Sequence, residues 1–216
     1  MKLFADPITV NCRKVLAGFD LMNVPFEREH IDYFKGEQKG ERYVAINPNA
    51  SLPALEDGDL VLWESNAILA YAAEKVGDTV AYPTGLAQRA DLHRGLLWES
   101  SSWFPANYAL LVENCVKPLL GAETDPAAVE TQEATFHKVA PVLEERLAKH
   151  QWVIGTDAPT IADIALAAPM HLHGWMKLPL ERYPAIRRWM FEGIEKLPSW
   201  DRTWVGKGFT TERGAA

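Results

Sequence analysis

Residues 47–65, NPNASLPALEDGDLVLWES, decide the fold of this chain. Two short apolar runs lie on either side of Asp57-Gly58, and an Asp-Gly pair between apolar runs is a strong signal for a β-hairpin. Pro53 stands at the start of the first run, where a proline marks a strand edge or a turn. The stretch therefore predicts two short antiparallel strands that are entered through a proline turn.

Glu64 and Ser65 close this stretch and open the segment NAILAYAAEK, in which Ile68, Leu69 and Ala72 share one helical face. The free backbone amides at a helix N-terminus attract anions. A serine at this place is also a common N-cap, so Ser65 is either an anion-binding residue, a cap, or both.

The chain before the hairpin alternates strand and helix signals. Residues 2–5 are an apolar strand candidate, and apolar side chains at helical spacing predict a helix over residues 11–22. Residues 24–32 form a weaker strand candidate, followed by a polar loop with glycines and a short helix over residues 41–46. We therefore expect an α/β domain that ends with the hairpin and its helix.

The rest of the chain carries helical spacing and almost no strand signal. We predict a mixed α/β domain at residues 1–78, a linker at 79–87 and an all-α domain at 88–216. The early strand-helix unit and the later hairpin-helix unit correspond to the two halves of a thioredoxin-like fold. Prolines inside the helical segments are expected to kink or restart a helix: Pro105, Pro141 and Pro169.

Charge and cysteine content limit the possible functions. The chain has 22 Lys plus Arg against 29 Asp plus Glu, a net charge of -7, so we expect no binding to nucleic acid or to anionic membranes. Cys12 and Cys115 are far apart and form no CxxC pair, which offers neither a disulfide framework nor a zinc site. The start of the chain lacks the apolar core of a signal peptide, so we predict a cytoplasmic protein.

The segment from Asn49 to Lys75, NASLPALEDGDLVLWESNAILAYAAEK, resembles the glutathione-binding segment of cytosolic glutathione S-transferases. That family has a proline just before the hairpin and a Glu/Gln-Ser pair at the start of the next helix. The resemblance covers the whole chain, including the late TIADI motif that begins at Thr160. It implies an enzyme that converts the thiol of its co-substrate glutathione to a thiolate, which attacks a small hydrophobic electrophile. A homodimer without a metal is also implied.

The resemblance assigns glutathione contacts to two regions. Pro53 is expected to be a cis proline that exposes the backbone of Leu52 to the cysteinyl part of glutathione. Ser65 is expected to bind the γ-glutamyl carboxylate, and Glu64 the γ-glutamyl ammonium group. For the glycine carboxylate, the pattern of the phi class of transferases points to two adjacent residues, with Lys35 as an alternative: Gln38 and Lys39.

Thiol activation is assigned to the first loop. Serine-type transferases place their hydroxyl where this chain has Thr9, and Asn11 adds an amide donor; this Thr-x-Asn pattern is similar to the nu class and to some related bacterial transferases. Cys12 is an alternative nucleophile, because a thiol beside a helix N-terminus is often reactive. In thioredoxin-like proteins, however, the attacking cysteine stands at the place of Thr9.

The second substrate is expected between the domains, against the first long helix of the helical half. Five residues there form an aromatic stripe that is either pocket or core: Trp103, Phe104, Asn107, Tyr108 and Leu111. His171 and His173, two positions apart, would point to different sides of a helix and do not suggest a metal site.

The sequence also indicates one structural motif and two alternative functions. Thr160 and Asp163 have the spacing of a capping box, a structural element. Glutathione-dependent reduction of disulfides or peroxides starts from the same thiolate as conjugation. A non-catalytic module of the same fold, which uses its helical half for docking, is the other alternative.

Overall fold

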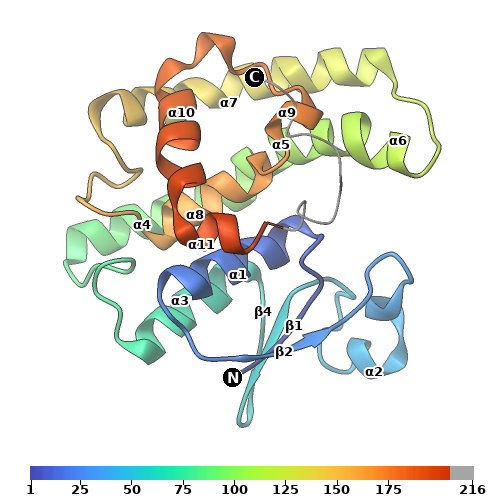
Figure 1. Ribbon diagram of the computed structural model, residues 1–216, viewed down its shortest axis with the longest axis vertical. Helices are drawn as coiled ribbons and strands as arrows, with labels where there is room; N and C mark the ends of the chain where they lie inside the picture. The colour runs from blue at the N-terminus through green and yellow to red at the C-terminus, as the bar shows by residue number, and fades with distance from the viewer. Residues whose placement is uncertain (205–216) are drawn as a thin grey trace.

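The N-terminal half is built on a four-stranded sheet with the strand order β2-β1-β3-β4 (Figure 1). Strand β1 (Lys2–Ala5) pairs in parallel with β2 (Glu27–His30) and antiparallel with β3 (Ala54–Asp57). Strand β3 in turn pairs antiparallel with β4 (Leu60–Trp63), as the Asp-Gly turn predicted. The computed structural model describes residues 1–204, and its mixed sheet confirms the thioredoxin-like prediction.

Helices α1 (Val10–Leu21) and α3 (Ser65–Val76) lie between the sheet and the helical half (Figure 1). The two helices pack closely at Gly18, where a Cβ atom would lie only 2.3 Å from Cδ2 of Leu69. A larger residue at position 18 would force the Leu69 side chain to move. The N-terminal ends of both helices, with their free backbone amides, also lie in one region, because Ser65 contacts Asn11 at 3.3 Å.

The remaining elements of the N-terminal half are short. The 3₁₀ turn η1 (Glu37–Lys39) and helix α2 (Glu41–Val44) connect β2 to the proline turn before β3. After α3, the chain passes through the predicted linker, in which the carbonyl of Ala81 accepts a hydrogen bond from the amide of Ile161. This contact fixes the linker to the helical half.

The helical half surrounds a core that contains the fully buried Trp103, Phe136 and Trp189. Its first helical stretch is interrupted by π-helical turns at η2 and η3, and α7 runs beside it, in contact with α5 (Figure 1). The elements are α4 (Leu86–Trp98), η2 (Glu99–Trp103), α5 (Phe104–Leu111), η3 (Val112–Val116), α6 (Lys117–Leu119), α7 (Pro126–Lys149), α8 (Ile161–Ala167), η4 (Ala168–Met170), α9 (His173–Met176), η5 (Leu180–Arg182), α10 (Pro184–Arg188), η6 (Trp189–Gly193), η7 (Ile194–Lys196) and α11 (Pro198–Arg202).

The three prolines behave differently. Pro105 lies in the first turn of α5, directly after the π-helical turn, and Pro169 lies in the 3₁₀ turn that follows α8. Both positions are places where a proline restarts or ends a helix, as predicted. Pro141 is inside α7, which continues through it, so the helix does not restart there, and a kink at this proline stays a prediction.

The boundaries of the two predicted domains stay a prediction. The end of the second predicted domain, residues 205–216, lies outside the described residues. Within residues 1–204, no helix has the length and apolar character needed to cross a membrane.

Candidate functional site

Asp6 organises the first loop. Its carboxylate accepts hydrogen bonds from the amides of Ile8, at 3.1 Å, and Tyr33, at 3.0 Å. Its backbone carbonyl accepts from the amide of Thr9, at 3.0 Å, and from the Thr9 hydroxyl, at 3.1 Å. Thr9 is the N-cap residue of α1, but its side chain makes no capping hydrogen bond. The hydroxyl of Thr9 therefore has to turn from the Asp6 carbonyl before it can donate to a ligand.

Cys12 lies in the core of the N-terminal half and is fully buried. Burial raises the pKa of its thiol to about 12, so the thiol is protonated at neutral pH. A buried, protonated thiol is neither accessible nor nucleophilic. The environment of Cys12 therefore disfavours the alternative in which it attacks the substrate.

The start of α3 contacts the first turn of α1. Ser65 is buried, and its hydroxyl donates to Oδ1 of Asn11 at a distance of 3.3 Å. The N-cap of α3 is Glu64 rather than Ser65, and neither side chain makes a capping hydrogen bond, so the interpretation of Ser65 as a cap is wrong. Glu64 is exposed and has the dihedral angles φ 74° and ψ 109°, which are rare for a residue with a Cβ. Such an outlier at a helix start suggests a functional constraint.

The Leu52-Pro53 peptide bond is cis, as predicted. The loop before it is held by two side-chain donors to the carbonyl of Ser51: the amide of the buried Asn47, at 2.8 Å, and the hydroxyl of Tyr43, at 2.7 Å. Leu52 itself precedes β3 and lies outside the ladder between β1 and β3. Its backbone is thus placed at the end of the sheet, where an added strand can pair.

The residues predicted for the glycine carboxylate lie in η1. Gln38 is 4% exposed, and its Oε1 has no hydrogen-bond partner among the described residues. Lys39 is exposed. The alternative, Lys35, is already engaged in an ion pair with Asp32, at 2.9 Å. Lys39 is therefore the better candidate for an exposed cation that meets a ligand.

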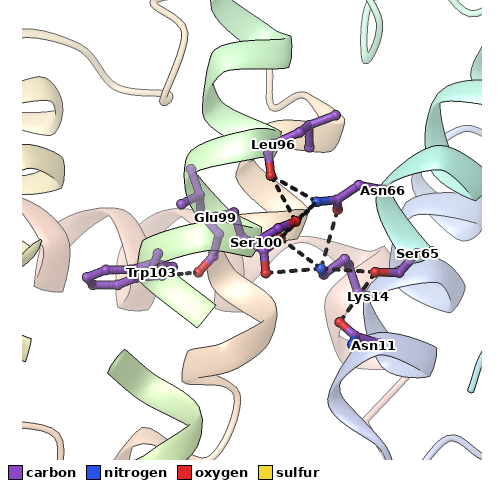
Figure 2. Close-up of polar contacts among 9 residues, drawn as sticks. Asn11, Lys14, Ser65, Asn66, Leu96, Glu99, Ser100 and Trp103 are labelled. Carbon is purple, nitrogen blue, oxygen red and sulfur yellow. Dashed lines mark hydrogen bonds and ion pairs between the residues drawn. The ribbon is translucent and has the colours of Figure 1, made fainter. Parts of the chain in front are cut away.

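A buried ion pair that the sequence interpretation missed lies beside Ser65. The Nζ atom of Lys14 is 3.0 Å from both carboxylate oxygens of Glu99 and donates to the hydroxyl of Ser65 at 3.1 Å (Figure 2). Lys14 and Glu99 have side-chain exposures of 2% and 0%. Burial lowers the pKa of Lys14, and the charge of Glu99 opposes that shift. A lysine among the apolar residues of a predicted core helix was the only sequence signal for this pair.

Asn66 extends this cluster across the boundary between the two halves. The two hydrogens of its Nδ2 are shared among Oε2 of Glu99 at 2.9 Å, the carbonyl of Leu96 at 3.0 Å and Oγ of Ser100 at 3.0 Å, while its Oδ1 accepts from Lys14 at 3.3 Å (Figure 2). Glu99 belongs to the π-helical turn η2, a type of irregularity that is frequent at functional sites.

Two of the five residues predicted for the second substrate are partly accessible. Phe104 is half-buried and stacks on Tyr108, with ring centroids 5.1 Å apart, and Tyr108 is 37% exposed. Burial raises the pKa of Tyr108, and the nearby Tyr33 raises it further. Tyr33, which the sequence interpretation missed, is an exposed residue of the loop after β2.

The other three predicted residues lie in the core of the helical half. Trp103 is fully buried, and its Nε1 donates to the carbonyl of Leu166 at 2.8 Å. The buried Asn107 donates to the carbonyl of Trp103 at 2.8 Å, and Leu111 is also buried. These contacts place the three side chains on the core side of the stripe, which leaves Phe104 and Tyr108 on the accessible side.

The two histidines have separate partners. The ring of His171 is buried against the carbonyl of Ala168, at 2.8 Å, and burial lowers its pKa to about 3. His173 lies 3.0 Å from Glu195. The described part of the chain contains no group of three or more His, Cys, Asp or Glu residues that could hold a metal ion.

Comparison with known proteins decides the family. Residues 2–74 match the model of the glutathione S-transferase N-terminal domain, and residues 105–197 match that of the C-terminal domain. The chain belongs to the glutathione S-transferase family. Glutathione S-transferase F7 of Arabidopsis thaliana is 35% identical over 166 residues, which cover 76% of this chain and 79% of the relative.

Solved structures of plant transferases have the same fold as this transferase. Glutathione transferase F7 from Populus trichocarpa superposes with a TM-score of 0.84 at 28% identity, covering 94% of this chain and 96% of the other. Glutathione S-transferase I from maize, in complex with an atrazine glutathione conjugate, has a TM-score of 0.82 at 26% identity, with 94% and 95% coverage. The chain is thus similar to F-type plant transferases over nearly its whole length.

Proposed function

We propose that this transferase activates the thiol of glutathione with the Asn11 amide and the Thr9 hydroxyl at the start of α1. The observation that carries the proposal is the 3.3 Å contact between Ser65 and Asn11, which joins the predicted anion site of α3 to the first loop. A carboxylate held at Ser65 therefore lies near the donors that would hold the sulfur. The Thr-x-Asn pattern makes this a Ser/Thr-type member of the family.

Simple energetics support activation without a general base. A cysteine thiol with a pKa near about 8.5 needs roughly 2.7 kcal/mol of preference for the thiolate to shift by about two units. Hydrogen bonds to a charged group contribute about 1.5 to 3 kcal/mol each, and the dipole of α1 helps. One donor from Asn11 and one from Thr9 are sufficient. The thiol proton passes to solvent, the sulfur forms the new bond to the electrophile, and the leaving group departs with its electron pair.

Glutathione is proposed to lie along the edge of the N-terminal half. The backbone of Leu52, before the cis Pro53, pairs with the cysteinyl unit. The first turn of α3, at Ser65, binds the γ-glutamyl carboxylate, and Glu64 meets the ammonium group. The glycine carboxylate is met by two residues of η1: Gln38 and Lys39.

The second substrate is proposed to be a small hydrophobic electrophile that lies against Phe104 and Tyr108. These two stacked rings provide a partly exposed aromatic surface. Trp103, Asn107 and Leu111 support this surface from the core. The maize transferase in complex with an atrazine glutathione conjugate shows that the same fold accommodates a conjugate of this kind. A panel of electrophiles, disulfides and peroxides separates conjugation from reduction.

The thiolate absorbance of the glutathione complex, followed against pH, tests this proposal. We expect Thr9→Val and Asn11→Ala each to raise the thiol pKa by about one to two units, because each removes a donor worth about 1.5 to 3 kcal/mol. Turnover at pH values below the new pKa should fall roughly ten- to hundredfold and recover at high pH. Cys12→Ala, the matched control in the first turn of α1, should leave the thiolate curve unchanged. An unaltered curve in the Thr9→Val, Asn11→Ala double variant contradicts the proposal.

A further inference from the structure

The direction of the hydrogen bonds around Ser65 is fixed by chemistry. The ammonium group of Lys14 can only donate, so in its 3.1 Å contact the oxygen of Ser65 must accept. The single hydrogen of the Ser65 hydroxyl then has to point elsewhere. Its other partner is Oδ1 of Asn11, at 3.3 Å, which is an acceptor (Figure 2).

This polarity also orients Asn11. A carboxamide whose oxygen accepts from Ser65 keeps its NH₂ group as the end left to donate. A thiolate needs donors and cannot use the oxygen of an amide. The order Lys14, Ser65, Asn11 therefore presents the correct end of the Asn11 side chain to a thiolate.

Glu99 holds the ammonium group of Lys14, which is the first donor in this series of hydrogen bonds. Its two oxygens lie 3.0 Å from Nζ of Lys14, and Oδ1 of Asn66 accepts a hydrogen bond from the same ammonium group at 3.3 Å. A lysine has three hydrogens to donate, so carboxylate, Asn66 and Ser65 occupy them all. Because Glu99 comes from η2 of the helical half, the donor direction at Asn11 depends on contact between the two halves.

We propose that Lys14, held by Glu99, is a positioning residue for thiol activation, which acts through the hydroxyl of Ser65 to orient the amide of Asn11. The inference rests on the proposed role of Asn11. It further implies that, in the glutathione complex, the γ-glutamyl carboxylate is bound by the backbone amide of Ser65 at the start of α3, while the hydroxyl of Ser65 stays directed at Asn11. Disturbing this relay should change the ionisation of a sulfur that neither Lys14 nor Ser65 touches.

A double-mutant cycle tests the relay at saturating glutathione, with the thiolate absorbance curve as readout. Ser65→Ala is expected to raise the thiol pKa by about 0.5 to 1 unit, and Ser65→Thr, which keeps a hydroxyl, to restore most of it. The Ser65→Ala, Asn11→Ala double variant should shift no further than Asn11→Ala alone, because Ser65 acts through Asn11. Additive shifts would overturn the relay and leave the role of Asn11 in place.

A second pair of variants tests Lys14 itself. Lys14→Met combined with Glu99→Gln removes both buried charges together and should raise the thiol pKa by about 0.5 to 1 unit. The matched control is Asp20→Asn with Arg202→Gln, which removes an ion pair between α1 and α11 without touching Ser65. The control should leave the curve unchanged. An unchanged curve in a folded Lys14→Met, Glu99→Gln protein refutes the inference, and if that protein does not fold, the Ser65 cycle decides.

The two proposals fail in different ways. If neither Asn11→Ala nor Thr9→Val moves the thiolate curve, the proposed function is wrong. If Asn11→Ala alone has no effect, Thr9 carries the activation and the relay is refuted. If Asn11→Ala raises the pKa but the Ser65 variants act independently of it, only the relay is refuted.

Discussion

At the scale of single residues, the chemistry of the site depends on where a few hydrogens point. The hydroxyl of Thr9 donates to the carbonyl of Asp6, whereas the amide of Asn11 keeps its donor end free by accepting from Ser65. Thr9 has to give up one hydrogen bond to serve the sulfur, and Asn11 does not. This difference favours Asn11 as the stronger contributor to thiol activation, with Thr9 second.

Lys39→Met is expected to weaken glutathione binding about fivefold, because an exposed charge contact contributes about 1 kcal/mol at most. The maximal rate should stay the same, since Lys39 is proposed to contact the glycine end and not the sulfur. Calorimetry with glutathione and with γ-glutamylcysteine, which lacks the glycine carboxylate, measures the effect. The loss should vanish with the shorter peptide.

Lys35→Met is the matched control for this prediction. Its side chain is 76% exposed and engaged with Asp32, so glutathione affinity should not change. A loss of affinity in Lys35→Met but not in Lys39→Met would move the carboxylate site from η1 to the preceding loop.

At the scale of elements, α8 starts with a capping box that the sequence predicted. Thr160 and Asp163 make the reciprocal bonds, and Asp163 also accepts from the amide of Val153, at 2.8 Å, and from Nε1 of Trp189, at 3.0 Å. The box could be predicted because its two residues are three positions apart. The contacts to Val153 and Trp189 could not, because they depend on how distant segments pack.

Asp163→Ala should lower the free energy of unfolding by more than about 3 kcal/mol, because it leaves several buried donors without an acceptor. Denaturant unfolding measures the change. Asp157→Ala, at an exposed position in the preceding loop, is the control and should have an effect within about 0.5 kcal/mol. Equal stability of the two variants would show that the buried bonds of Asp163 are not needed.

The helical stripe shows where prediction of an element's face failed. Trp103, Asn107 and Leu111 are spaced by four residues and are buried, whereas Phe104 and Tyr108, each one position later in the helix, are accessible. Neighbouring positions on a helix differ in direction by about 100°. The predicted stripe therefore combined two faces of the helix, one in the core and one accessible.

At the scale of the whole molecule, structure within the N-terminal half could be predicted from the sequence, but contacts between the two halves could not. The hairpin of β3 and β4 followed from the Asp57-Gly58 turn signal, and the thioredoxin-like fold of the N-terminal half followed from the order of its strand-helix and hairpin-helix units. The pairing of Lys14 with Glu99 could not be predicted, because the two residues are separated by 85 positions and meet only when the halves pack. Pattern reasoning finds contacts within an element and misses those between domains.

We propose that the protein is a homodimer and expect a dimer mass by light scattering at micromolar concentration. Several large apolar side chains are exposed on β4 and α4, and a second copy of the chain would cover them: Leu60, Val61, Trp63, Leu86 and Leu97. Trp63→Glu, at the edge strand, should shift the mass toward the monomer, whereas Leu119→Glu, on α6, should not. A monomeric mass for the unmodified protein refutes this prediction.

The buried pair of Lys14 and Glu99 also restricts how this chain can exchange its domains with a relative. Each residue is neutralised by a partner encoded in the other half of the gene, and an unpaired buried charge costs several kcal/mol. A chimera that joins this N-terminal half to a helical half with an apolar residue at the place of Glu99 would carry that cost in full. Recombination between relatives is therefore expected to succeed only where the lysine and its acid are inherited together.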